Sequence, residues 1–140
     1  MTQIVEAMNA EETARVEAQR SWVRDHYAAE ARCGYDTVEG KLVLLDAILG
    51  NGWIDATDTL KLQCLGIAFG DAMAQRLGLH WVTVEDAYGR DPALKRDDTS
   101  LLAFPLTSIS KRIERGDTVD VRALFESACS AIEQAMRDGA

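Results

Sequence analysis

The sequence has few residues of the kinds that build metal sites or disulfides. Its 140 residues include two histidines and three cysteines, Cys33, Cys64 and Cys129, which are widely spaced and form no C-x-x-C motif. An odd number of separated cysteines does not make a closed disulfide framework, so we expect free thiols in a reducing compartment, the cytoplasm. We also expect no metal ion and no cofactor, because an isolated cysteine is more often a small buried residue than a ligand.

Long apolar runs, leader sequences and linkers are also missing. The most apolar segment, residues 62–74, is interrupted by Gln63 and Asp71 and falls short of the roughly 20 apolar residues of a membrane span. No basic segment followed by an apolar run opens the chain, and no repeat or Pro/Gly/Ser-rich linker divides it. We therefore expect a single domain over residues 1–140 without membrane contact, with residues 1–8 as a flexible or frayed N-terminus.

Acidic residues outnumber basic ones by 23 to 15, which gives a formal net charge of −8. A negative field repels phosphate, so we expect no nucleic-acid partner and no attraction to an anionic membrane surface. The same field suits solubility or a protein partner. The oligomeric state stays open.

Sequence motifs of common enzymes are absent as well. The chain has no G-x-G-x-x-G, P-loop, H-E-x-x-H or G-x-S-x-G pattern. Residues 108–111 fit S-x-x-K, but the companion motifs of the penicillin-binding enzymes are missing. We assign no catalytic residue and expect a protein that is not an enzyme.

The hydrophobic periodicity predicts an α+β fold with three N-terminal helices, a three-stranded antiparallel meander and two C-terminal helices. Asn9 and Glu12 form a capping box for a first helix that Gly34 ends, and Asp36 with Glu39 forms a second box. A third helix begins between residues 55 and 57 and runs to about 77. Its apolar residues surround the axis, which is typical of a buried central helix.

The period changes after residue 79. Segments 80–85, 93–96 and 100–104 predict three strands, and the connections between them are too short for parallel crossovers. Pro105 suits the start of a fourth helix, and a fifth begins at Asp120. We expect the third and fifth helices to cover one face of the sheet.

Three segments in this region carry a resemblance. Residues 78–82, 86–91 and 104–112 contain a Trp-Val strand, a Tyr-Gly turn and a Phe-Pro…Lys-Arg segment. Together, over residues 78–125, they resemble a family of uncharacterised bacterial proteins known as domain of unknown function 3806. The resemblance implies relatives for the C-terminal half and no particular activity.

Two functions fit these observations. The first is a small acidic non-catalytic protein-interaction module, immunity-like or chaperone-like. The alternative is a small-molecule-binding protein or enzyme with a pocket between the sheet and the fourth helix. The candidate binding residues are Trp81, Glu85, Arg90, Asp91, Lys95, Lys111 and Arg112.

Two further expectations concern charged residues. Asp71 interrupts the most apolar helix, and we expect it on a solvated edge, because acids are rarely buried unless they are paired. We expect Lys111 to be solvated, and Arg112 to lean on apolar surface and pair with Glu85.

Overall fold

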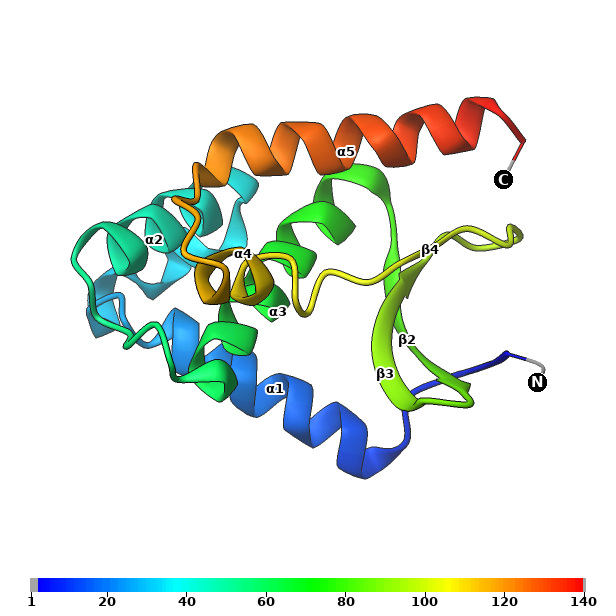
Figure 1. Ribbon diagram of the computed structural model, residues 1–140, viewed down its shortest axis with the longest axis horizontal. Coiled ribbons are helices and arrows are strands. Elements are labelled where there is room, and N and C mark those ends of the chain that lie inside the picture. Colours follow the sequence, from blue (N-terminus) through cyan, green and yellow to red (C-terminus); the bar gives the residue numbers. More distant parts are fainter. Residues whose placement is uncertain (1–2, 140) are drawn as a thin grey trace.

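The computed structural model, which describes residues 3–139, combines six helices with a four-stranded antiparallel sheet. Five of the helices lie on one side of the sheet, and the last one, over residues 121–137, runs on past it (Figure 1). The predicted α+β class is therefore confirmed. The helical elements are α1 (Ala10–Arg24), the 3-10 helix η1 (Ala29–Asp36), α2 (Val38–Gly50), α3 (Thr59–Leu77), α4 (Ser110–Glu114) and α5 (Val121–Arg137).

The sheet has one strand more than the predicted meander. The strands β1 (Ile4–Glu6), β2 (His80–Asp86), β3 (Gly89–Lys95) and β4 (Leu102–Ala103) lie in this order, each antiparallel to its neighbour. Residues 4–6, expected to be frayed, pair with residues 83–85. A three-residue strand is too short to show a period of two, so its pairing partner decides its structure. Of the expected frayed terminus, residues 1–2 lie outside the described part.

The hairpin between β2 and β3 is tighter than predicted. Ala87 and Tyr88 form the turn, and β3 begins at Gly89, whose φ of 128° favours glycine. Pro92 lies within β3, where it pairs with Thr83. Because β4 pairs with residues 94–95 alone, β3 is an edge strand at Pro92, where a missing N–H is tolerated.

Several helix ends differ from the prediction. The Asn9–Glu12 capping box is present, but α1 ends at Arg24 and the chain turns into η1 before Gly34. Thr37, not Asp36, caps α2 by accepting a hydrogen bond from the Gly40 N–H at 2.9 Å. Asp36 ends η1, so its backbone is committed to that helix.

The entry to α4 is also later than expected, at Ser110 rather than Pro105. The chain first passes along α3, where a Cβ at Gly66 would overlap the carbonyl oxygen of Leu106. Similarly, a Cβ at Gly70 would meet Trp81 and Pro105 at 2.6–2.7 Å. The two glycines therefore allow the chain to pack tightly on α3, and this contact holds residues 105–106 out of a helix.

The core is centred on α3, as predicted. Nine of its residues are buried, and Phe69 meets Phe125 of α5 edge to face, with ring centroids 5.8 Å apart. Whereas α5 was expected on the sheet, it packs against α3 and α2 (Figure 1). The opposite face of the sheet holds a smaller cluster of Val82, Val84 and Ala93.

The expectation that Asp71 lies on a solvated edge of its helix is wrong. Its side chain is 10% exposed, and each carboxylate oxygen accepts two hydrogen bonds. Arg20 of α1 donates from Nε at 2.6 Å and from Nη2 at 2.8 Å, Tyr35 of η1 donates its hydroxyl at 2.7 Å, and Trp81 of β2 donates Nε1 at 2.9 Å. Four elements therefore meet at one carboxylate.

Replacing Phe125 with alanine tests the core. Phe125 is fully buried, so we expect Phe125→Ala to lower the free energy of unfolding by about 3–5 kcal/mol, the range for emptying a buried aromatic site. Urea unfolding followed by circular dichroism measures the change. Tyr88→Ala, at a side chain 96% exposed, is the control and should change little. Equal effects of the two substitutions would contradict this packing.

Replacing Asp71 tests the four-element contact. Asp71→Ala leaves Arg20 with Glu17 as its remaining carboxylate partner and removes the acceptor of Tyr35 and Trp81. We expect a loss of about 3–5 kcal/mol, the range for breaking a buried ion pair. The matched control is Asp117→Ala, which removes a pair with Arg115 that is half exposed and worth less than about 1 kcal/mol. The interpretation fails if both variants unfold at the same urea concentration.

Candidate functional site

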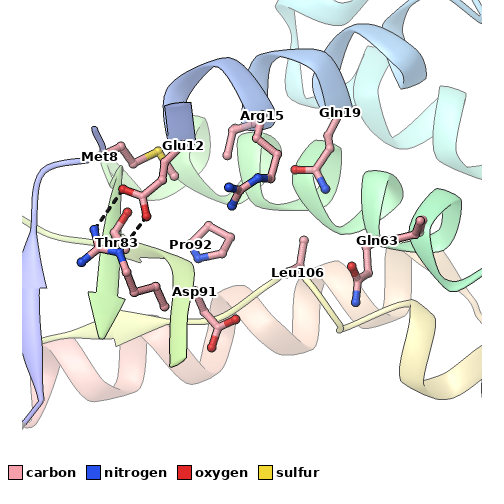
Figure 2. A pocket seen from close by; sticks show the side chains of 12 residues that line it. Met8, Glu12, Arg15, Gln19, Gln63, Thr83, Asp91, Pro92 and Leu106 are labelled. Atoms are coloured by element: carbon pink, nitrogen blue, oxygen red, sulfur yellow. Dashed lines mark hydrogen bonds and ion pairs between the residues drawn. The ribbon is translucent and has the colours of Figure 1, made fainter. Parts of the chain in front are cut away.

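A pocket of about 200 Å³ opens between α1, the start of α3 and the β2–β3 hairpin (Figure 2). Its apolar wall combines residues from separate parts of the chain: Met8, Val16, Leu60, Pro92 and Leu106. The approach of residues 105–106 to Gly66 places Leu106 in this wall. The pocket thus depends on the same close packing that delays α4.

An ion pair closes one end of the pocket. Arg90 of β3 donates from Nε and Nη2 to the two carboxylate oxygens of Glu12, both at 3.0 Å. Nη1 of Arg90 also reaches Glu6 at 3.1 Å and Glu85 at 3.2 Å. The capping box fixes Glu12 from its own helix, because the Asn9 N–H donates to it at 3.1 Å. Hydrogen bonds from Arg90, and then the one from Asn9, hold the pKa of Glu12 at about 2.

Thr83 lies beside this ion pair at the centre of the sheet. The residue is 2% exposed and is placed between Glu6 on β1 and Pro92 on β3. Its hydroxyl lies close enough to Glu12 to help lower the carboxyl pKa, yet Oγ1 makes no hydrogen bond of good geometry within residues 3–139. A buried hydroxyl in this state raises the free energy of the empty fold.

The mouth of the pocket carries polar side chains that the rest of the fold does not use. Arg15 and Gln19 are four residues apart and share one face of α1, and Figure 2 shows both extending from that helix toward the pocket. Arg15 is 58% exposed, and its ion pair in the described region is a long one of 3.8 Å to Glu11. Neither Gln19 nor Gln63 makes a side-chain hydrogen bond to another described residue. The pocket therefore presents free N–H donors over an apolar wall.

Asp91 joins this pocket to a second hollow of about 240 Å³. The two share Asp91, Pro92 and Leu106, and the second also contains Phe104 and Lys111. Phe104 is 49% exposed and Lys111 is exposed. Of the candidate residues, the structure brings Arg90 and Asp91 to the first pocket and Lys111 to its neighbour.

The other candidates serve internal contacts. Trp81 donates to Asp71, Glu85 accepts from Arg90, and Lys95 donates to the carbonyl oxygens of Arg96 and Thr99. These contacts hold the sheet and its last loop in place.

Arg112 is half-buried, as expected, while Lys111 is solvated. The predicted pair between Arg112 and Glu85 is wrong. Arg112 donates to the Ser108 carbonyl oxygen at 2.7 Å, in the turn that precedes α4, and Glu85 is occupied by Arg90.

The residues that sequence reasoning missed lie mainly on α1. Glu12 was recognised as part of a cap, and the same carboxylate is the partner of Arg90. Arg15, Gln19 and Gln63 have the pattern of solvated helix faces, and no spacing in the sequence marks them. Their common feature is that they face the hairpin, which depends on tertiary structure.

Metal and membrane features can be assessed over the described residues. Residues 3–139 contain no group of three or more His, Cys, Asp or Glu side chains placed to hold a metal ion. Within the same range, no helix combines the length and apolarity of a membrane span. Cys33 is exposed, Cys64 is half-buried and Cys129 is buried, and all three are free.

Comparison with known protein families gives one match. The family model described as Domain of unknown function (DUF3806) matches residues 41–125. The chain belongs to the DUF3806 family. The matched segment includes Gln63, Thr83 and Leu106. It begins after α1, so it does not include the α1 side of the pocket. No curated protein matches this DUF3806 chain.

A solved structure shares the fold. A crystal structure from Bacteroides thetaiotaomicron VPI-5482 superposes on this DUF3806 chain with a TM-score of 0.72 at 14% sequence identity. The alignment covers 91% of this chain and 47% of the other, so this chain spans about half the length of its structural neighbour. At that identity the likeness shows the fold alone.

The Glu12–Arg90 pair predicts acid sensitivity. The pKa of Glu12 is about 2, against 4.5 for the unperturbed group, so its stabilisation is complete above about pH 4.5 and is lost as the pH falls toward 2. We expect wild type to be more stable than Glu12→Gln at pH 7 and the difference to shrink between pH 4.5 and 2. Urea unfolding across this pH range measures it.

Glu11→Gln is the control, because Glu11 lies in the same helical turn with a side chain 85% exposed. Its long, exposed ion pair with Arg15 is worth less than about 1 kcal/mol, so this variant reports the loss of a charge in this turn without the Arg90 contact. A constant difference for Glu12→Gln over the same pH range would show that Arg90 does not perturb Glu12.

Proposed function

We propose that this domain is a non-catalytic ligand-binding domain that takes a small molecule into the pocket between α1 and the hairpin. The observation that carries the proposal is the Thr83 hydroxyl, which is buried in the pocket wall without a hydrogen bond of good geometry. Native folds satisfy nearly all buried polar groups, and a ligand is one of the ways in which an exception is satisfied. A ligand that bonds to this hydroxyl removes the penalty.

Binding is favoured over catalysis by the state of Glu12. With a pKa of about 2 the carboxylate is a weak base, and it is unprotonated at neutral pH, so it is poorly matched to general acid or base chemistry. Thr83 accordingly has no adjacent base strong enough to activate its hydroxyl as a nucleophile. The polar groups around the pocket are suited to hydrogen bonding and charge recognition.

The size of the pocket limits the ligand. A volume of about 200 Å³ lies below the roughly 300–1,000 Å³ typical of sites for drug-sized compounds. We therefore infer a ligand of few heavy atoms whose apolar part contacts Pro92 and Leu106.

A protein-interaction role, immunity-like or chaperone-like, is our second proposal. It is supported by the net charge of −8 and by Trp53, which is 52% exposed and stacks on His26 at 5.8 Å. Tryptophan is enriched in interaction hot spots. If this role is correct, Trp53→Ala abolishes binding of a partner and substitutions in the pocket leave it intact. We also propose a cytoplasmic location, which the three free cysteines support.

Replacing Thr83 with valine tests the binding proposal. The change preserves side-chain shape and removes a buried hydroxyl whose approach to Glu12 lacks good hydrogen-bond geometry, so we expect the free energy of unfolding to rise by about 1 kcal/mol. We expect fragment-sized compounds that shift the amide resonances of pocket residues in wild type to bind Thr83→Val more weakly. Two-dimensional NMR of labelled protein, together with urea unfolding, measures both effects.

Thr99→Val is the matched control, because the Thr99 hydroxyl donates to the Arg96 carbonyl oxygen and accepts from the Leu101 N–H. It should destabilise the fold and leave fragment binding unchanged. If Thr83→Val destabilises equally, the hydroxyl already serves the empty fold. If a fragment library shifts no pocket resonance, the binding proposal is wrong.

A further inference from the structure

We propose that the ligand of this pocket is a small monocarboxylic acid with a branched apolar tail. Arg15 and the Thr83 hydroxyl, which line the same pocket, both donate to the carboxylate, and the tail lies against Val16, Pro92 and Leu106. The inference rests on the proposed binding function and adds the chemical class of the ligand.

Arg15 is the available cation of the pocket. Both positive side chains in the lining are arginines, and Arg90 is occupied by Glu6, Glu12 and Glu85. Arg15 has its long contact to Glu11 at 3.8 Å and is otherwise unpaired within residues 3–139. A guanidinium binds a carboxylate through two parallel N–H bonds, so this position favours a carboxylate over a neutral acceptor.

The neighbours of Arg15 add donors of the correct type. Gln19 extends beside it from the same face of α1, and Gln63 faces the pocket from α3 (Figure 2). Each amide group supplies two N–H donors and one carbonyl acceptor. Either glutamine can therefore turn its N–H2 group toward an anion held by Arg15, although the amides alone do not select for an anion.

The acidic residues in the lining favour a competing class of ligand, an organic cation. Glu12 and Asp91 also line the pocket, and an organic cation would be attracted to them. Glu12, however, is already paired with Arg90 through two bonds of 3.0 Å. In Figure 2 the Asp91 carboxylate points away from Arg15 and α1, and Asp91 also borders the second hollow. The unpaired charge that faces this pocket is accordingly the positive charge of Arg15.

The apolar wall defines the other end of the ligand. Val16 is 5% exposed and forms the α1 side, while Pro92 and Leu106 are half-buried on the opposite side. A short branched tail gains free energy by removing these surfaces from water, at about 25 cal/mol per Å². The six-carbon 4-methylpentanoate carries such a tail and is small enough for this space.

Titration of the full chain with three compounds that share one branched tail tests the ligand class. The compounds are 4-methylpentanoate, its neutral amide and 4-methylpentylamine, and the readouts are calorimetry and shifts of pocket amide resonances. We expect the acid to bind and the amide to bind at least about tenfold more weakly, the size of one hydrogen bond to a charged group. An amine that binds as tightly as the acid would overturn the proposal, because it would show that Glu12 and Asp91 decide recognition.

Two arginine variants separate a specific role from bulk charge. Arg15→Met retains most of the side-chain length and should weaken acid binding at least about tenfold while leaving the weak affinity for the amide unchanged. Arg96→Met removes the same charge from the exposed loop between β3 and β4 and should leave acid affinity unchanged. Equal losses in the two variants would overturn the role of Arg15.

Two further outcomes separate this inference from the proposed function. If none of the three compounds binds but other fragments shift the pocket resonances, the ligand class is wrong and the binding function stands. An acetylated tripeptide ending in leucine presents the same carboxylate on a polypeptide. Tighter binding of this peptide than of 4-methylpentanoate would overturn the assignment to a free acid.

Discussion

The rest of the structure depends on the carboxylate of Asp71, which accepts four hydrogen bonds from three other elements. A charge with a side chain 10% exposed is tolerated when it is paired and bonded, so α1, η1 and β2 must all be in place for α3 to bury this residue. This requirement explains why α1 stops at Arg24. The chain must turn there for Tyr35 to reach the same carboxylate that Arg20 binds, and a helix continuing to Gly34 would separate the two donors.

The pocket follows from how α1 is held at two points. Arg20 ties its C-terminal half to α3 through Asp71, and Glu12 ties its N-terminal turn to the sheet through Arg90. Between these ion pairs, α1 presents Val16 to the core and Arg15 with Gln19 to the hairpin. Because α1 is held at both ends, it forms one wall of the pocket, and its side chains do not have to fill the pocket to keep the helix in place. The wall opposite is fixed by different means, because the close contact at Gly66 sets the position of Leu106.

The helices and strands that could be predicted are those marked by a local pattern of residues in the sequence. The apolar surround of α3, the aromatic and β-branched residues of β2 and the capping box at Asn9 are local patterns, and each predicted its element. The burial of Asp71 depends on donors 51 and 36 residues away in the sequence, and no local pattern contains them. The same holds for Arg15 and Gln63, which are indistinguishable from solvated residues until the hairpin is placed against them. Sequence reasoning therefore found three of the four strands and missed most of the pocket.

Several arginines contribute little free charge, because they form ion pairs that join one helix or strand to another. Arg76 bonds to Glu126 between α3 and α5, and Arg122 bonds to Glu39 between α5 and α2. Arg20 and Arg90 are likewise committed to carboxylates on other elements. In a chain with a net charge of −8, these bridges use much of the positive charge to hold acidic elements together. Arg96, Arg112 and Arg137 also lack a close carboxylate within residues 3–139, but none of them lines this pocket. The position of Arg15 at the mouth therefore makes it the residue on which recognition of an anion depends.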